Sequence, residues 1–142
     1  MATESLAARL VTALPSDKSG LLILLQGELG AGKSTLARAM LHHMGHTGPV
    51  PSPTYTLVEP YELADFSVYH IDLYRVSDEE ELRFLGWTEL EEGLRIVEWP
   101  DRAPGIAAEA DLLLTLNYQE PGRQADLEGV SAAGAEILAK LP

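Results

Sequence analysis

Residues Gly27 to Ser34 read GELGAGKS, and the apolar run LLILL at Leu21 to Leu25 stands immediately before them. The octet satisfies the pattern GxxxxGK[ST], which forms a phosphate-binding loop when it follows a strand and opens a helix. We interpret the apolar run as the strand that precedes this loop. The stretch therefore predicts a strand, a phosphate-binding loop and a helix in direct succession.

The residue types of this loop match the chemistry of a nucleoside triphosphate. Glycines at positions 27, 30 and 32 let backbone N–H groups turn toward phosphate oxygens. Lys33 supplies a point charge for the terminal phosphates, and Ser34 offers a hydroxyl oxygen to Mg²⁺. The helix that begins here adds the positive end of its dipole. We therefore expect nucleotide binding at this loop.

Size and composition limit the class of protein. The chain has 142 residues and no Cys, and this length is typical of one domain, so we expect a single domain over residues 1–142. The lack of Cys excludes disulfides, thiolate nucleophiles and zinc–thiolate sites, and it favours a cytoplasmic protein. The N-terminal sequence lacks the pattern of a secretory signal, and no apolar run approaches the length of a membrane span.

The charge balance is strongly acidic. Lys and Arg total 10 against 22 Asp and Glu, so the net charge is −12. Direct gripping of a nucleic-acid backbone needs clustered cations and is therefore disfavoured. Two explanations of the acidity stay open, namely solubility alone or an acidic face that docks a basic partner.

Apolar periodicity and turn residues predict the remaining elements. Leu6, Leu10 and Leu14 indicate a short N-terminal helix, and a helical stripe from Lys33 to Met44 ends at Gly45. Further predicted elements are paired strands at 54–58 and 67–74, a strand at 94–98, strands at 111–117 and 124–128 joined by a turn at Pro121-Gly122, and a helix over 131–141.

Ser77 to Glu80 have the Ser-x-x-Glu spacing of a capping box. In such a box the serine hydroxyl satisfies a free N–H while the glutamate reaches back to the start of the helix. We therefore interpret the acidic run Asp78 to Glu81 as a helix start rather than a metal site, and we expect Glu80 to be the residue that reaches back.

Two acids follow apolar runs at positions where a magnesium-nucleotide site needs a carboxylate. Glu98 ends the run Leu94 to Val97, and Asp72 lies in HIDLYR. Ligands of open α/β sheets gather at the carboxyl ends of strands, so either acid is a candidate. We favour Glu98 as the magnesium partner of Ser34 and assign Asp72 to orienting the attacking water. The residues alone do not decide which acid positions the water.

Other polar residues carry weaker signals. His42 and His46 are spaced to share a helix face, but no acid is near them in sequence, which favours a solvated surface. Trp99 could pack beside the nucleotide or close the end of its strand. Arg75 could stabilise transferred charge or form an ordinary surface ion pair.

Four segments together strongly resemble the bacterial TsaE family: GELGAGKS, SPTYTLVEPY at 52–61, VYHIDLYR at 68–75 and IVEWP at 96–100. The phosphate-binding loop is common to many NTPases, whereas the other three segments in this order are specific to that family. The resemblance implies an ATPase that is needed for forming threonylcarbamoyladenosine in tRNA, next to the anticodon. It further implies the partner proteins TsaB and TsaD, through which tRNA would be contacted.

Residue roles carried over from the resemblance concern ATP, magnesium and catalysis. Lys33, Thr54 and Asp72 are the expected catalytic residues, with Thr54 in a switch-like loop that senses the terminal phosphate. Magnesium is expected at Ser34 and Glu98. The residues expected to bind ATP are Glu28, Leu29, Gly30, Ala31, Gly32, Lys33, Ser34, Thr35 and Trp99. Glu28 and Ser34 stand where the family often has Asp and Thr, and both replacements keep the needed carboxylate or hydroxyl.

Two other functions are compatible with the same loop. A small-molecule kinase needs a lid that closes over its acceptor, usually with several cationic side chains, and the sequence has no Arg-rich segment of that kind. In a nucleotide-gated binding module, ATP would only order the Thr54 loop for docking, and hydrolysis would be incidental. The expected fold is a single three-layer α/β domain of the P-loop NTPase type, with a mostly parallel central sheet and an antiparallel hairpin addition at 54–74.

Overall fold

In the computed structural model, which describes residues 2–28, 32–119 and 122–141, six strands form one sheet in the order β2-β3-β4-β1-β5-β6. The strands are β1 (Leu22–Gly27), β2 (Val58–Glu62), β3 (Ser67–Asp72), β4 (Leu94–Glu98), β5 (Leu112–Gln119) and β6 (Gly122–Gly129). The α-helices are α1 (Ala2–Ala13), α2 (Lys33–His43), α3 (Glu81–Phe84) and α4 (Ala132–Ala139). Three 3-10 helices, η1 (Glu89–Glu92), η2 (Pro100–Arg102) and η3 (Pro104–Glu109), lie between β3 and β5 in the chain.

The sheet is parallel in its centre and antiparallel at both edges. Strands β3, β4, β1 and β5 run parallel to one another, whereas β2 pairs antiparallel with β3 and β6 pairs antiparallel with β5. The predicted α/β class and the antiparallel hairpin are therefore confirmed. A second antiparallel pair, β5 and β6, lies at the opposite edge and corresponds to the strands predicted at 111–117 and 124–128. Pro121 of the turn predicted between them lies outside the described residues.

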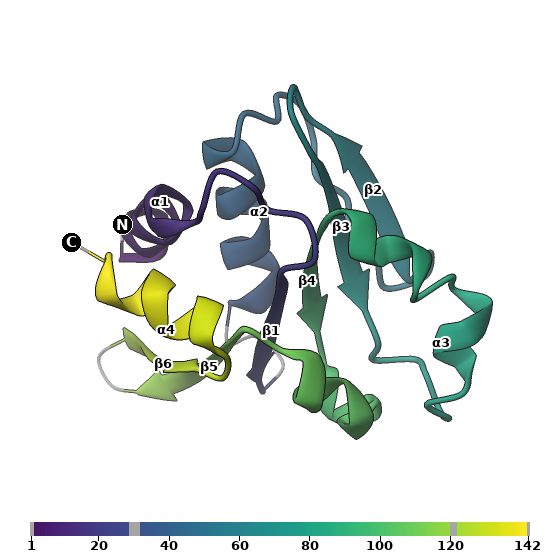
Figure 1. Cartoon of the computed structure of the whole chain (residues 1–142). Helices are drawn as coiled ribbons and strands as arrows, with labels where there is room; N and C mark the ends of the chain where they lie inside the picture. The colour runs from purple at the N-terminus through teal and green to yellow at the C-terminus, as the bar shows by residue number, and fades with distance from the viewer. Residues whose placement is uncertain (1, 29–31, 120–121, 142) are drawn as a thin grey trace.

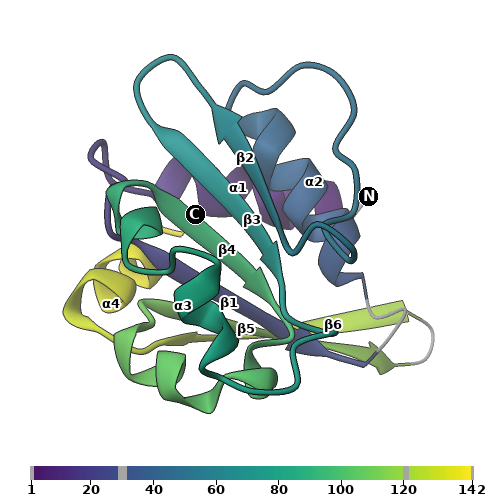
Figure 2. The ribbon, with the colours of Figure 1, turned by 90° about the vertical axis from the view of Figure 1, so that its right-hand side faces the viewer.

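Helices cover both faces of this sheet and make three layers. Helices α1, α2 and α4 lie on one side, while α3 and the 3-10 helices lie on the other (Figure 1). The view turned by 90° looks onto the second side, with α3 in front of the sheet and α1 and α2 behind it (Figure 2). The two apolar cores are separated in the same way, one on each face of the sheet.

The apolar run that precedes the glycine-rich loop supplies both cores. Ile23 and Leu25 belong to the core beneath α1 and α2, while Leu22 and Leu24 belong to the core beneath α3. Side chains alternate between the faces of a strand, so a strand in the middle of a three-layer fold must be apolar at every position. This requirement explains why the LLILL run shows no polar alternation.

One predicted strand is displaced. The expected strand at 54–58 is wrong in its bounds, because residues 54–56 form a turn in which the Leu57 N–H bonds to the Pro53 carbonyl at 2.7 Å. The strand begins at Val58 instead and runs through Pro60, which pairs with Tyr69. Proline lacks the N–H of a ladder bond and is tolerated here because β2 is an edge strand.

The capping residue of α3 also differs from the prediction. Glu81, and not Glu80, reaches back: its Oε2 accepts hydrogen bonds from the Ser77 N–H, the Ser77 hydroxyl and the Asp78 N–H, each at 3.0 Å. The helix begins only at Glu81, whereas a capping box with Ser77 as its N-cap would start the helix at Asp78. The interpretation of this acidic run as a helix start nevertheless holds.

The carboxyl ends of β1, β3 and β4 meet at one edge of the sheet, where α2 begins (Figure 1). Ligand sites of parallel α/β sheets form at this edge because successive loops leave it in different directions. Among the helices in the described part of the chain, none has the length and apolar character needed to cross a membrane.

Candidate functional site

The loop between β1 and α2 has the backbone conformation that glycine allows. Gly27 has φ 145°, and Gly32, which caps α2, has φ 105°. Residues with a Cβ rarely adopt these values, so the glycines at 27 and 32 are required by the turn itself. The expected ATP-binding residues Leu29, Gly30 and Ala31 lie outside the described part of the chain.

Lys33, the first residue of α2, folds back onto its own loop. Its Nζ donates to the Gly27 carbonyl at 2.6 Å and to the Glu28 carbonyl at 3.1 Å. The same ammonium lies 4.1 Å from the centre of the Trp99 ring, within cation–π range. An incoming phosphate would therefore compete with two carbonyl oxygens and one aromatic ring for this cation.

Three carboxylates surround the buried ammonium. Burial lowers the pKa of Lys33, and the charges of Glu98, Asp72 and Asp101 act in the opposite direction. The pocket lining holds one cation, Lys33, against two acids, Asp72 and Glu98, which leaves it with excess negative charge. A divalent cation at this place would offset that excess, so the charge balance suits magnesium together with a phosphate.

Ser34 and Glu98 form the centre of the site. The Ser34 hydroxyl donates to the two carboxylate oxygens of Glu98 at 3.0 and 3.2 Å. The second side chain on Glu98 is His70, whose Nε2 lies 2.6 Å from Oε2, and both the His70 and Glu98 side chains are almost fully buried. The predicted pair of Ser34 and Glu98 is therefore in direct contact. These are hard oxygen ligands of the kind that Mg²⁺ prefers.

Strand register explains how these residues meet. Asp72 is paired with Glu98 across β3 and β4, and His70 is paired with Ile96 two positions earlier. Positions two apart on a strand point to the same face, which for β3 and β4 is the face covered by α2. His70, Asp72 and Glu98 therefore all face the first turn of α2.

His70 is the buried residue in contact with the site that sequence reasoning missed. It lies in HIDLYR beside Asp72, and a histidine inside an otherwise apolar strand is the signal that could have identified it. Its spacing of two from Asp72 places both side chains on one face of the strand. The sequence contains no feature that pairs His70 with Glu98, because that contact depends on the order of strands in the sheet.

Asp72 is held by its own strand end and by the loop before β2. Its Oδ1 accepts from the Tyr74 N–H at 2.9 Å, and its Oδ2 accepts from the Thr54 hydroxyl at 3.2 Å. Burial raises the pKa of Asp72, the Tyr74 hydrogen bond lowers it, and the neighbouring Glu98 charge raises it further. The net direction is upward because this carboxyl is withdrawn from water.

The two non-glycine residues with positive φ in the described part of the chain both adjoin these carboxylates. Trp99, with φ 59°, directly follows Glu98. Leu57, with φ 69°, offers its carbonyl to the Asp72 N–H at 2.9 Å. Such conformations cost about 1–3 kcal/mol and are found preferentially at functional sites. Trp99 adopts its conformation directly after Glu98, and Leu57 adopts it in the loop whose carbonyl accepts from the Asp72 N–H.

These contacts enclose a pocket of about 250 Å³. Eight of its lining residues belong to the site predicted from the sequence. The ninth is Tyr74, whose ring centre lies 4.8 Å from that of Trp99. The lining residues are Gly32, Lys33, Ser34, Thr35, Thr54, Asp72, Tyr74, Glu98 and Trp99. Of the predicted site, Glu28 alone among the described residues is absent from the lining and contributes its carbonyl to Lys33.

Of the residues with weaker signals, Trp99 lines this pocket, while His42, His46 and Arg75 lie outside its lining. The ring nitrogens of His42 and His46 lie within hydrogen-bond distance of the Gly48 and Pro49 carbonyls, at 3.1 and 3.2 Å. The Arg75 guanidinium stacks on the ring of the exposed Tyr55 at 4.9 Å. Neither histidine lines the pocket, and a catalytic role for Arg75 stays a prediction.

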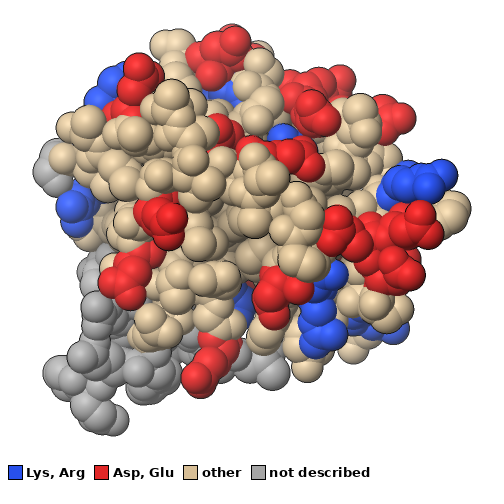
Figure 3. Space-filling model, turned by 60° about the horizontal axis from the view of Figure 1, so that its bottom comes forward, with Lys and Arg blue, Asp and Glu red and all other residues tan. Residues whose placement is uncertain are grey.

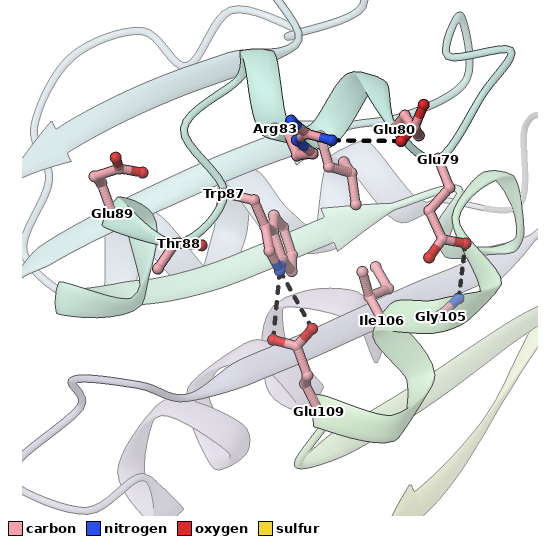
Figure 4. A pocket seen from close by; sticks show the side chains of 10 residues that line it. Glu79, Glu80, Arg83, Trp87, Thr88, Glu89, Gly105, Ile106 and Glu109 are labelled. Atoms are coloured by element: carbon pink, nitrogen blue, oxygen red, sulfur yellow. Dashed lines mark hydrogen bonds and ion pairs between the residues drawn. The ribbon is translucent and has the colours of Figure 1, made fainter.

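A second, larger hollow of about 480 Å³ lies on the α3 side of the sheet. Trp87 and Ile106 line it, the Trp87 indole donates to Glu109 at 3.4 Å, and the Gly105 N–H donates to Glu79 at 3.0 Å (Figure 4). None of the residues predicted for nucleotide or metal binding belongs to its lining. The described residues predicted for nucleotide and metal binding are therefore gathered at the smaller pocket.

Comparison with known proteins places this geometry in a family. The family described as "Threonylcarbamoyl adenosine biosynthesis protein TsaE" matches residues 1–125. The tRNA threonylcarbamoyladenosine biosynthesis protein TsaE of Haemophilus influenzae is 41% identical over 133 residues, which cover 92% of this chain and 84% of that protein. The protein of the same name from a Nostoc species is 34% identical and covers 85% of this chain and 78% of its own length.

The fold has a counterpart of known structure. The crystal structure of YdiB from Bacillus subtilis aligns with a TM-score of 0.76, covers 97% of this chain and 86% of its own, and shares 24% sequence identity. At this identity the match concerns the fold alone. The family match and the two relatives carry the assignment further, and they confirm the family expected from the four sequence segments. This chain belongs to the TsaE family.

Proposed function

We propose that the chain is a Mg²⁺-dependent ATPase that acts in the threonylcarbamoyladenosine modification of the tRNA adenosine next to the anticodon. The observation that carries the proposal is the convergence of Lys33, Ser34, Asp72 and Glu98 on one pocket at the start of α2. The family to which the chain belongs, and the names of its relatives, indicate the modification.

The loop and the first turn of α2 would hold the phosphates. Lys33 would exchange its two carbonyl partners for phosphate oxygens, which are stronger acceptors because they are charged. Ser34 and Glu98 would hold Mg²⁺, and their present contact at 3.0 Å brings both oxygens to one place. The bound ion would neutralise charge on the phosphates. Trp99, stacked on Lys33, is placed to contact the nucleotide as well.

Asp72 is our candidate for orienting the attacking water. Its carboxylate lies beside Glu98 in the strand register but has no contact with Ser34 among the contacts of the described residues. A carboxylate that is not engaged by the metal can accept a hydrogen bond from water and direct its lone pair at phosphorus. The Tyr74 N–H and the Thr54 hydroxyl fix the position of this carboxylate.

Thr54 would report the presence of the terminal phosphate. Its hydroxyl contacts both Asp72, at 3.2 Å, and Ser52, at 2.7 Å, so it belongs to the site and to the exposed loop before β2 at once. A phosphate that draws this hydroxyl toward itself would move the loop with it. The loop could then present a different surface to a partner when ATP is bound.

The charge of the chain supports indirect contact with tRNA. The net charge is −12, and the face in Figure 3 shows Lys and Arg atoms in separate groups among more numerous acidic atoms. Strong binding of a nucleic-acid backbone requires clustered cations. We therefore propose that tRNA is reached through the partner proteins TsaB and TsaD and that the chain works in the cytoplasm.

The test is ATP turnover, measured as phosphate release with Mg²⁺, for the unmodified chain and for Lys33→Ala and Glu98→Ala. We expect both variants to lose turnover by a factor on the order of 10²–10³, because each removes a charged group from the transferring phosphoryl site. Lys140→Ala and Glu136→Ala, at exposed positions on α4 and its end, are the matched controls and should retain turnover.

Adding TsaB and TsaD to the same assay tests the partner part of the proposal. Slow turnover that accelerates with these proteins would support it, since P-loop NTPases often depend on a partner for full activity. Equal turnover in the unmodified chain, Lys33→Ala and Glu98→Ala would show that the pocket is not the seat of hydrolysis.

A further inference from the structure

His70 is a buried polar side chain to which the proposed function assigns no part. It lies in the middle of β3 with its residue 1% exposed, and its Nε2 sits 2.6 Å from the Glu98 carboxylate. Its other ring nitrogen, Nδ1, is buried and has no hydrogen-bond partner among the described residues. Burial of a polar ring with one nitrogen unpaired costs free energy, so a buried group of this kind needs an explanation.

We propose that His70 is a positioning residue that holds Glu98 in the orientation needed to receive the divalent cation beside Ser34. The inference rests on the proposed function, because it concerns the same carboxylate. His70 itself would touch neither metal nor nucleotide. Its effect would pass entirely through Oε2 of Glu98, which it contacts directly.

The missing partner of Nδ1 indicates where the ring proton is. If the ring carried hydrogen on Nδ1, a buried N–H would remain without an acceptor, and such groups are rarer and less favourable than an unused lone pair. With hydrogen on Nε2 instead, only a lone pair is left without a partner. His70 therefore acts as a donor through Nε2, and Glu98 accepts.

The hydrogen bond from His70 gives the two carboxylate oxygens of Glu98 different partners. Oε2 is engaged by His70 at 2.6 Å, while Oε1 is the nearer of the two oxygens to the Ser34 hydroxyl, at 3.0 Å. A glutamate side chain has several rotatable bonds and would otherwise sample other orientations. The hydrogen bond from His70 keeps one oxygen directed toward Ser34, where the cation would bind.

Residues that orient a metal ligand through a hydrogen bond commonly change metal affinity by about 10- to 100-fold when they are replaced. Replacing His70 should therefore reduce the gain in nucleotide affinity that Mg²⁺ causes, while nucleotide affinity without metal should change little. A histidine that only stabilises the fold would not separate these two quantities. The separation is what the experiment measures.

The experiment is calorimetric titration of the full chain with ADP, in Mg²⁺ and again in EDTA, for the unmodified protein, His70→Leu and His70→Gln. Leucine keeps much of the volume but has no donor, whereas the glutamine amide retains an N–H at the end of its side chain. We expect the gain in ADP affinity caused by Mg²⁺ to fall about 10- to 100-fold in His70→Leu and to be largely restored in His70→Gln. Affinity in EDTA should be the same in all three.

A double-substitution cycle with Glu98→Ala shows whether the effect passes through that carboxylate. Once Glu98 is replaced, His70→Leu should cause no further loss of magnesium-linked affinity. Equal losses with and without Glu98, or equal losses in His70→Leu and His70→Gln, would overturn the proposal. An unchanged magnesium gain in His70→Leu would overturn it as well.

The ring proton can be observed without any ligand. Long-range nitrogen–proton NMR correlations of the unmodified chain should identify the form of His70 with hydrogen on Nε2, and hydrogen on Nδ1 alone would contradict the proposal. This measurement does not need folded variants. If the unmodified chain bound no ADP with or without Mg²⁺, the proposed function would fail, while the NMR result would still test the placement of His70 against Glu98.

Discussion

The two hollows of this molecule differ in volume and, more importantly, in whether the charged side chains around them are buried or exposed. The hollow on the α3 side is about 480 Å³ and the pocket at the start of α2 about 250 Å³. The described residues include five buried polar or charged side chains. Four of these, Lys33, His70, Asp72 and Glu98, lie in or against the smaller pocket.

The fifth, Arg95, lies behind the larger hollow rather than in its lining. Its guanidinium stacks on Trp87 at 4.6 Å and faces the exposed Glu109 at 3.6 Å. The glutamates that line this hollow are all exposed, so water already satisfies them. Among the described residues, four of the five buried polar or charged side chains gather at the smaller pocket, whereas the charged side chains that line the larger hollow are all exposed. Burial of charge, and not volume, therefore marks the candidate site.

The strongest way to test this contrast is Asp72→Asn, which keeps the shape of the side chain and removes its charge. If Asp72 orients the attacking water, turnover should fall by a factor on the order of 10²–10³, because a positioned base is lost. ADP affinity should stay within about twofold, since Asp72 is not expected to hold the phosphates. The measurements are phosphate release and calorimetric titration with ADP.

A variant of Asp72 that turned over ATP at the unmodified rate would move the water-positioning role to Glu98 or elsewhere. If turnover were lost while partner binding and tRNA modification were intact, the chain would act as a nucleotide-gated binding module. The control is Asp65→Asn, an exposed acid in the turn between β2 and β3.

A smaller effect is expected on the free energy of unfolding, which should depend on pH because Asp72 is buried in the smaller pocket. The pKa of Asp72 is raised above 3.8 in the folded chain, chiefly by burial, with Glu98, Lys33 and His70 facing it from the neighbouring elements. The folded chain therefore binds this proton more readily than the unfolded chain does. Stability from this group is present at low pH and is lost as pH rises through the folded pKa.

Asparagine does not titrate, so Asp72→Asn should gain in free energy of unfolding relative to the unmodified chain as pH rises from about 4 to about 7. Urea unfolding at several pH values measures the difference. A difference that stayed constant across this range would mean that Asp72 is ionised as easily in the folded chain as in the unfolded one.

The smallest effect is expected in the larger hollow. Glu89→Gln removes a charge from an exposed lining residue, so the free energy of unfolding should change by no more than about 0.5 kcal/mol. Turnover and ADP affinity should be unchanged. A clear loss of turnover in Glu89→Gln would show that the two hollows are coupled, and it would contradict the conclusion that only the smaller pocket takes part in turnover.

Local signals predicted much of this molecule. Periodicity and turn residues placed α1, β1, α2, β4 and α4, because the features that identify these elements lie within a few residues. Prediction was less accurate for the bounds of β2 and for the residue that caps α3. The strand expected at 54–58 lies at Val58–Glu62 instead, where Pro60 is tolerated because β2 is an edge strand. The capping residue of α3 is Glu81 rather than Glu80.

The amino-acid sequence by itself determined the glycine-rich loop, its lysine and serine, and the acid at the end of β4, because each depends on neighbours in the chain. The tertiary structure alone decided that β3 lies next to β4 and β4 next to β1. That order brings Asp72 level with Glu98 and puts His70 against the same carboxylate. Strand order depends on how whole strands pack in the sheet, and no local pattern records it.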